Sequence, residues 1–384
     1  MRPLPTPERG HAYPGALPLY FYKDNERPAS GGTRRKGTEP TMKEKTQNPG
    51  GAGVILAALV GLTSLFLLSF LLGRYPVSLG DLFRVLGAKL TRTACEVPEM
   101  VQSVILKVRI PRICAAILIG GALAVSGAVY QGLFKNPMVS PDILGASAGA
   151  GFGAAVAILC SLPFVAIQGL AFLFGLAAVA LSCAICRAVS HGKDALLLLV
   201  LSGMVISTLF SSLVTLAKFV ADPFSKLPEI TYWLMGGLSA VKDSDVLMLA
   251  VPFVAGVVPL MLLRWQLNAM AFGEEEAQSM GLNTGRLRMI FIVCATLLTA
   301  SSVAVCGMIG WVGLVIPHLS RMLGGPNYQR LLPATFLIGG IFLLAVDDIA
   351  RTLFTMEIPL GILTSIIGAP FFVYLLFKRR KGWV

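Results

Sequence analysis

The apolar positions of this chain gather into long hydrophobic segments, and the polar positions fall into the stretches between them. A helix needs about 20 apolar residues to cross a membrane, and nine segments reach or approach that length. A tenth, 309–324, is shorter and is interrupted by Pro317. The nine clear spans are expected at 52–72, 113–134, 143–162, 164–186, 195–220, 246–264, 286–306, 332–354 and 359–377.

The charges at the two ends of the chain decide between nine spans and ten. Both termini are rich in Lys and Arg, and basic segments next to a span tend to stay on the cytoplasmic side of the membrane. Two cytoplasmic termini require an even number of spans. We therefore predict an all-α polytopic membrane protein with ten transmembrane helices, counting 309–324 among them.

The composition supports a membrane protein and excludes other classes. Hydrophobic residues make up 55% of the 384 residues and charged residues 14%, whereas a soluble domain carries about 25% charged residues. A soluble enzyme, a disordered protein and a nucleic-acid-binding protein are thereby excluded. Of the seven cysteines, Cys183 and Cys186 have a metal-like spacing but no second pair, so we expect neither a metal site nor a disulfide framework.

Residues 1–50 differ from the rest of the chain. They are rich in Pro, Gly, Lys and Arg and lack hydrophobic periodicity. This composition predicts a disordered cytoplasmic tail, followed by a membrane domain over 51–384. One hypothesis is that the functional chain begins at Met42, directly ahead of the first span. The alternative is a genuine tail whose basic cluster at 34–36 contacts anionic lipid.

Ionisable residues are nearly absent from the predicted spans, where such residues are costly and usually functional. Asp347 and Arg351 in the ninth span are spaced to pair on one helix face. Either they neutralise each other, or Arg351 faces an external partner. His318 is the single histidine in the predicted spans, which gives little support to a proton-coupled transporter or an intramembrane enzyme. The chain has no phosphate-binding glycine loop with which to hydrolyse ATP itself.

The polar segment Asn268–Thr284 follows the sixth span on the side predicted to be cytoplasmic. It carries Glu274, Glu275 and Glu276, on the side where basic residues are the rule. Two short helices joined at Gly273 fit its pattern. The segment is either a solvated loop or a docking element for a soluble partner that supplies energy.

A weak internal repeat is also visible. Gly127 precedes Pro137 by ten residues, and Gly307 precedes Pro317 by the same interval. Because five spans separate the two units, they would have opposite orientations, as the inverted repeats of transporters do. Coincidence is the alternative.

Seven motifs stand in a characteristic order along the chain. They are RIPR (Arg109–Arg112), SGAVYQGLFKNPMVSPDILGASAGA (Ser126–Ala150), YWLMGGL (Tyr232–Leu238), GEEEAQSMGLN (Gly273–Asn283), GWVGLVIPHLSR (Gly310–Arg321), DDIAR (Asp347–Arg351) and EIPLGILTSIIGAPFF (Glu357–Phe372). Together they resemble the permease family of ABC importers for ferric siderophores, haem and cobalamin, the FecCD type. The resemblance runs from about Val108 to Phe377.

The resemblance implies a ten-helix subunit that pairs with a second copy of itself around one central pathway. The chain would not be an enzyme, because ATP would be hydrolysed by separate ATPase subunits. Cargo would arrive on an extracytoplasmic substrate-binding protein, and no cofactor is implied. Ferric siderophore is the first expectation for the cargo, followed by haem and cobalamin. The alternative function is secondary transport of a bulky solute without an ATPase.

The resemblance also implies roles for individual residues. The inner gate is expected at Asn136, Pro137, Met138, Leu196 and Leu197. The hydroxyls expected to line the pathway belong to Ser202, Ser207, Thr208, Thr364 and Ser365. The ATPase-coupling residues, within the loop 268–284, are Phe272, Gly273, Glu274, Glu275, Glu276, Gln278 and Gly281. Three arginines are expected on the outer surface, where they would pair with glutamates of the binding protein: Arg109, Arg112 and Arg351.

Overall fold

The computed structural model describes residues 50–190, 195–353 and 355–379. The predicted tail and the start-site hypothesis at Met42 therefore lie outside the described residues. Every regular element in the described ranges is helical. The all-α fold class predicted from the apolar pattern is confirmed.

Each of the ten predicted spans corresponds to one helix. Among the described residues, seven helices are long and apolar enough to cross a membrane. The other three, α5, α13 and α15, fall short of that length or hydropathy, so the count of ten spans stays a prediction. The ten helices are α1 (Gly50–Leu71), α4 (Ile110–Leu133), α5 (Ala146–Leu159), α6 (Phe164–Val189), α7 (Ala195–Val220), α9 (Asp243–Leu262), α12 (Thr284–Cys306), α13 (Val312–Gly324), α14 (Tyr328–Thr352) and α15 (Leu360–Arg379).

Shorter helical elements connect these spans. They are α2 (Leu79–Thr91), α3 (Glu99–Ser103), the π-helix η1 (Val104–Arg109), the 3₁₀-helix η2 (Pro141–Leu144), α8 (Lys226–Met235), α10 (Arg264–Phe272) and α11 (Glu274–Ser279).

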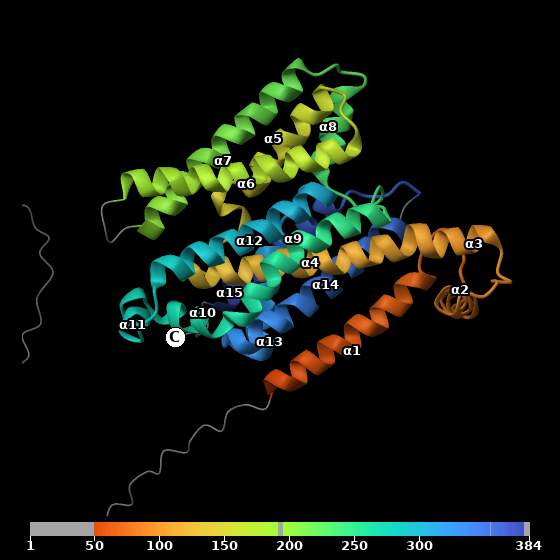
Figure 1. Cartoon of the computed structure of the whole chain (residues 1–384), viewed down its shortest axis with the longest axis horizontal. Helices are drawn as coiled ribbons and strands as arrows, with labels where there is room; N and C mark the ends of the chain where they lie inside the picture. Colours follow the sequence, from red (N-terminus) through yellow and green to blue (C-terminus); the bar gives the residue numbers. More distant parts are fainter. Residues whose placement is uncertain (1–49, 191–194, 354, 380–384) are drawn as a thin grey trace, which may run out of the picture. The chain divides into compact units, whose positions relative to one another are not determined.

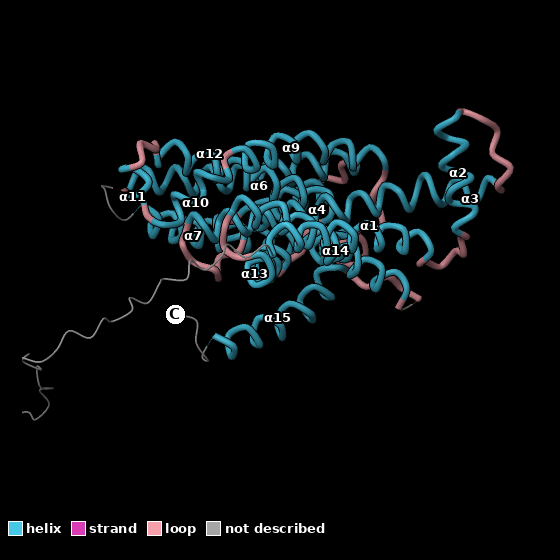
Figure 2. Tube along the Cα trace, turned by 90° about the horizontal axis from the view of Figure 1, so that it is seen from below, coloured by secondary structure: helices cyan, strands magenta, loops and turns pink. Residues whose placement is uncertain are grey.

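Helix α4 forms the centre of the bundle. It packs against α9, α12, α13 and α14, and Figure 1 shows it running through the middle of these helices. Helices α5, α6 and α7 pack on one another as a second group, which α12 joins to α4. Figure 2 shows α15 standing away from the bundle, and its main contacts are with α8, α13 and α14. Much of α15 is therefore uncovered within one subunit.

Hydroxyl-bearing side chains join α4 to α12. The Ser126 hydroxyl donates to the carbonyl of Ala295 at 3.0 Å and lies 2.8 Å from the hydroxyl of Thr299. The hydroxyl of Tyr130 lies 3.0 Å from that of Thr296. Such bonds satisfy polar groups between membrane helices. The runs that contain α4 and α12 are the most buried of the seven candidate spans, and the two helices occupy equivalent places in the proposed inverted repeat.

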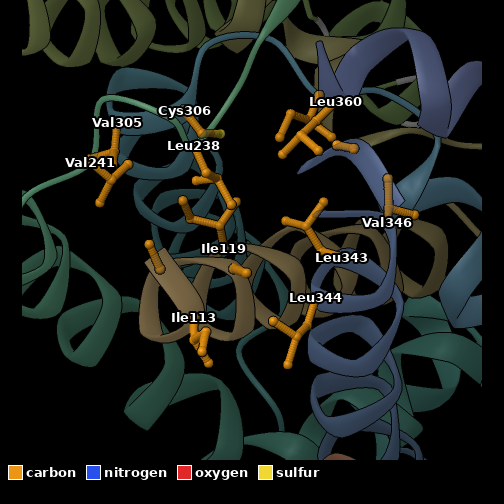
Figure 3. Close-up of a cluster of buried hydrophobic side chains, with 14 of the residues drawn as sticks. Ile113, Ile119, Leu238, Val241, Val305, Cys306, Leu343, Leu344, Val346 and Leu360 are labelled. Atoms are coloured by element: carbon orange, nitrogen blue, oxygen red, sulfur yellow. The ribbon is translucent and has the colours of Figure 1, made fainter. Parts of the chain in front are cut away.

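A hydrophobic core holds together the region where α4 begins and α14 ends. In Figure 3, Ile113 and Ile119 of α4 lie with Leu343 and Leu344 of α14, and Leu360 from the start of α15 is close by. All five side chains are essentially inaccessible to solvent. This packing sets where the three helices meet and thereby positions the charged residues beside it.

The stretch 73–112, which connects the first two predicted spans, is largely helical. Helix α2 is amphipathic and buries Leu82 and Val85. The elements α3, η1 and α4 form one continuous helical run, and Pro111 lies in the first turn of α4. The wider π turn ahead of Pro111 accommodates a residue that has no N–H to donate. The RIPR motif therefore belongs to a helix.

Candidate translocation and coupling site

Arg112 of α4 lies between two carboxylates. Its Nε donates to the two oxygens of Asp347 at 3.0 and 2.9 Å, and its Nη2 donates to Asp347 Oδ1 at 2.8 Å. Its two Nη atoms donate to Glu357 at 3.1 and 3.0 Å. Asp347 comes from α14, and Glu357 comes from the segment that leads into α15. Arg112 therefore ties three parts of the chain together.

Arg351 and Arg109 are also bound within the chain. Arg351 forms its closest ion pair with Asp348, whereas Asp347 lies 3.9 Å from its Nε. The pair predicted from the i, i+4 spacing is thus the weaker of the two contacts. Arg351 also donates to the backbone carbonyl of Ser69 at 2.6 Å. Arg109 donates to two backbone carbonyls in the region where α1 ends.

The exposed placement that we expected for these three arginines is not found. None of them is more than 7% exposed. The three carboxylates of Asp347, Asp348 and Glu357 balance their formal charge, because a charge taken out of water is stable only when it is paired. Glu357, with 27% of its side chain exposed, is the most accessible of the carboxylates. The structure holds the arginines in a buried, self-neutralised cluster, called the arginine cluster below, which consists of Arg109, Arg112, Arg351, Asp347, Asp348 and Glu357.

The first predicted gate segment forms a tight turn after α4. The side-chain oxygen of Asn136 accepts the backbone N–H of Met138 at 2.9 Å. Both residues are exposed, and Pro137 between them is half-buried. Lys135 enters the turn with a φ of 49°, and its ammonium donates to the backbone carbonyl of Phe272 at 3.4 Å. The gate turn is thereby joined to the predicted coupling segment.

Beyond the turn, η2 anchors the gate segment on α7. Gly203 of α7 lies so close to the carbonyl of Ile143 that a side chain at that position would clash with it. The hydroxyl of Ser147 donates to Asp142. Burial raises the pKa of the Asp142 carboxyl above its usual range, while the bonds from Ser147 and Ser140 oppose that shift. The loop before α5 is thus fixed to the helix predicted to line the pathway.

The second predicted gate segment is described only in part, because residues 191–194 lie outside the described ranges. Leu196 in the first turn of α7 is half-buried. Leu197 beside it is 69% exposed. An apolar side chain this exposed at the start of α7 is available to a neighbouring chain or to a solute.

The hydroxyls predicted to line the pathway fall into two groups. Thr208 of α7 is exposed, and Ser207 and Ser365 are half-buried. Ser202 and Thr364 are buried, and their hydroxyls donate to backbone carbonyls of the same chain at 2.9 and 3.2 Å. A solute cannot reach Ser202 or Thr364 in this conformation, so the structure corrects their placement.

The segment 268–284 contains two short helices joined at Gly273, as its pattern predicted. Glu274 is held by an ion pair with Arg288 of α12. The next two acids of α11, Glu275 and Glu276, are exposed. The structure therefore separates one acid that is paired within the chain from two that are exposed.

Apolar side chains lie on either side of the exposed acids. Phe272 is 77% exposed and Met280 is 54% exposed, and Gln278 and Gly281 are exposed with them. Aromatic residues and methionine are enriched where proteins bind one another. The exposed residues from Phe272 to Gly281 are called the coupling surface below, and its exposed Phe272 and Met280 are residue types that favour protein contact.

A pocket of about 630 Å³ lies between the gate turn and α10. Lys135 and Pro137 line it on one side, Trp265 and Phe272 on another, and Arg321 of α13 contributes a second cation. The pocket adjoins both the gate turn and the coupling surface. No group of His, Cys, Asp and Glu side chains in the described residues could hold a metal ion.

Sequence reasoning missed Glu357 and Lys135. Glu357 begins the last of the seven motifs, and a single acid just ahead of an apolar span could have indicated a partner for one of the arginines. Lys135 gave no such signal, because its partner Phe272 is 137 positions away in the chain.

The fold and these surfaces define a class of protein. A helical bundle of membrane spans, with one helix left uncovered and a short helix pair exposed at one end, is a multi-pass membrane protein. The chain matches the FecCD transport family over residues 61–378 and belongs to that family. It is therefore a permease subunit of an ABC importer, in which a separate subunit hydrolyses ATP.

Individual relatives agree with the family. The chain is 41% identical to the molybdate import system permease protein MolB of Haemophilus influenzae, over 84% of this chain and 96% of that protein. It is 42% identical to the "Probable iron chelatin transport system permease protein" of Helicobacter pylori, over 72% of this chain and 83% of that protein. A solved structure of an ABC transporter in an inward-facing conformation has a TM-score of 0.76 and 38% identity, covering 85% of this chain and 99% of that chain.

Proposed function

We propose that this permease carries an iron chelate, in the manner of a ferric siderophore or haem, across the cytoplasmic membrane, with both of its termini in the cytoplasm. The observation that carries the proposal is the character of the two predicted pathway helices. Lys218 is the only charged residue of α7, and the charges of α15 lie at its last two residues. Apolar walls with a few hydroxyls suit a bulky chelate that must be released again.

Relatives support the same cargo class. The name of the Helicobacter pylori relative assigns it to iron chelatin transport, and a 34% identical relative in Yersinia pestis is a haemin transport system permease protein. A cobalamin permease of Halobacterium salinarum is 39% identical. These cargoes are bulky, which fits a pathway between two subunits better than a narrow channel within one.

A second copy of the chain would complete that pathway. Within one subunit α15 stands apart (Figure 2), and it exposes apolar side chains such as Ile366 and Tyr374. Helix α7 exposes Leu201 and Val205. Exposed apolar surface of this extent marks a protein or lipid contact. We assign these faces of α7 and α15 to the partner copy and to the pathway, with lipid covering the rest.

The coupling surface would receive the ATPase subunit. Glu275 and Glu276 would meet basic residues of the ATPase, and Phe272 would fill an apolar recess beside them. A movement of α10 reaches the gate turn through the bond between Lys135 and the Phe272 carbonyl. This bond gives the ATPase a direct mechanical connection to the inner gate.

The substrate-binding protein would dock on the arginine cluster by exchanging one of its own carboxylates for Glu357. Glu357 is the most exposed carboxylate on Arg112, so an acid of the binding protein can replace it without leaving Arg112 unpaired. Exchange of one carboxylate for another preserves the charge balance of the buried cluster. Docking would then loosen the connection between α14 and α15, because Glu357 belongs to that connection.

Uptake by cells tests the cargo. Cells that lack the chromosomal copy would be complemented with the full chain and supplied with labelled iron as hydroxamate, catecholate or haem, with labelled cobalamin and molybdate in parallel. We expect uptake of an iron chelate to be restored and to be blocked by vanadate, which inhibits ABC ATPases. Uptake that resists vanadate would instead indicate a secondary transporter.

Molybdate is a second candidate cargo, and one observation favours it. The molybdate permease MolB aligns over 96% of its length, more than the 83% of the iron chelatin relative. Restoration of molybdate uptake alone, with no gain for any iron chelate, would replace the iron assignment while leaving the importer mechanism intact.

A further inference from the structure

The pocket beside the gate turn has positive side chains and no acid. It is bounded by the end of α4 and the gate turn, by α10, by the end of α13 and by the start of α14. Lys135 and Arg321 line it together with Gln131 and Tyr328. The four parts of the chain that form its walls are distant in sequence, so the pocket is a product of the tertiary fold.

Neither cation forms an ion pair with a carboxylate of the residues that the structure describes. Arg321 donates to the side-chain oxygen of Gln131 and to the hydroxyl of Tyr328, the latter at 3.4 Å, and Lys135 donates to a backbone carbonyl. This electrostatic environment calls for an anion.

The location of the pocket indicates where the anion comes from. Trp265, which is 50% exposed, lines the pocket, and it follows closely on the last residue of α9, Leu262, which is 75% exposed. An exposed Trp just beyond an apolar helix face is typical of the membrane–water interface. The pocket therefore opens at the depth of the lipid headgroups.

We propose that this pocket binds the phosphate of an anionic phospholipid headgroup. Arg321 and Lys135 would each donate a charge-assisted hydrogen bond to the phosphate oxygens, the chemistry for which both side chains are suited. Basic pockets between membrane helices bind such headgroups. Because Lys135 and Phe272 both line the pocket, the bound lipid would bridge the gate turn and the coupling surface. This role goes beyond transport of the cargo.

The test measures stabilisation by lipid. The full-length chain, purified in an uncharged detergent, is titrated with short-chain phosphatidylglycerol while its thermal unfolding is followed. Phosphatidylcholine of the same chain length and inorganic phosphate are titrated separately. The proteins compared are the wild type, Lys135→Gln, Arg321→Gln and the control Arg286→Gln, which removes an exposed charge near α11 but outside the pocket lining.

We expect phosphatidylglycerol to raise the unfolding temperature of the wild type at lower concentration than phosphatidylcholine does. Each pocket variant should need about tenfold more lipid for the same shift, because one charge-assisted bond is lost. Arg286→Gln should match the wild type. Lys135 is exposed and makes one contact, so Lys135→Gln carries the test if Arg321→Gln does not fold.

Three results separate the possibilities. If inorganic phosphate stabilises the protein as well as the lipid does, and with the same dependence on Lys135 and Arg321, the pocket is a phosphate site. Its ligand is then a free anion, and the assignment to a lipid is overturned. Equal lipid responses in all four proteins overturn the proposal. An unchanged lipid response, combined with loss of the ATPase from purified Lys135→Gln and Arg321→Gln, also overturns it, because the cations would then belong to the ATPase interface.

Discussion

Replacement of Arg112 by methionine tests whether the arginine cluster stabilises the bundle. The change removes all five hydrogen bonds from the guanidinium to Asp347 and Glu357 and leaves the fully buried Asp347 without its closest partner. Removing one member of a buried ion pair costs about 3–5 kcal/mol. We expect the free energy of unfolding in mixed detergent micelles to fall by that amount.

Two further variants define the origin of this loss. Arg84→Met in α2 removes an exposed arginine and should change the free energy of unfolding by no more than about 0.5 kcal/mol. The double variant Arg112→Met with Asp347→Leu leaves no unpaired buried charge at this pair, so it should recover much of the stability. Glu357 remains, but its partial exposure lets water solvate it.

The same proteins distinguish a structural cluster from a docking surface. Association with the substrate-binding protein is measured at low and high salt for each variant. If Arg112→Met unfolds like the wild type within about 1 kcal/mol and only associates more slowly, the buried network contributes little to stability and our reasoning fails. Glu357→Gln removes the carboxylate that competes for Arg112. This change should accelerate association, because the two Nη atoms of Arg112 are then available to an acid of the binding protein.

The coupling surface and the helix contacts give two further predictions. Charge reversal of Glu275 and Glu276 to Lys should abolish copurification of the ATPase while the protein still inserts into the membrane. The control Glu96→Lys, at another exposed acid, should leave copurification unchanged. If the protein with both reversals still binds the ATPase, the proposed interface is wrong. In Gly127→Ala the new methyl group meets the backbone of α13, so stability should fall by about 1–3 kcal/mol. Gly53→Ala, which meets no atom within 4 Å, is the matched control, and equal stability of the two variants would show that α4 and α13 can separate without cost.

The coupling segment shows why some details could be predicted and others could not. Its two helices and the break at Gly273 follow from local composition, which acts over a few residues. From the sequence alone, the three consecutive acids of this segment could not be distinguished by their partners or their exposure. The fold distinguishes them, because Arg288 of α12 reaches Glu274 and leaves Glu275 and Glu276 exposed.

The arginine cluster shows the same limit over a longer distance. The sequence indicated that Arg112 and Arg351 share a location, but it placed both on the surface. The buried position of Arg112 depends on Asp347, 235 residues away. A charge count along the chain cannot reveal whether a cation meets an acid of its own chain or one of a partner.

The sequence by itself determined the class of the protein and the position of its long apolar helices. Long apolar segments with 14% charged residues permit a membrane bundle and little else, because each span must satisfy its own backbone hydrogen bonds. The tertiary structure alone decided which polar residues face inward, as it did for Ser202 and Thr364, and which cations share the pocket beside the gate turn. The physical reason is that helix formation depends on neighbours in the sequence, whereas burial and charge pairing depend on neighbours in space.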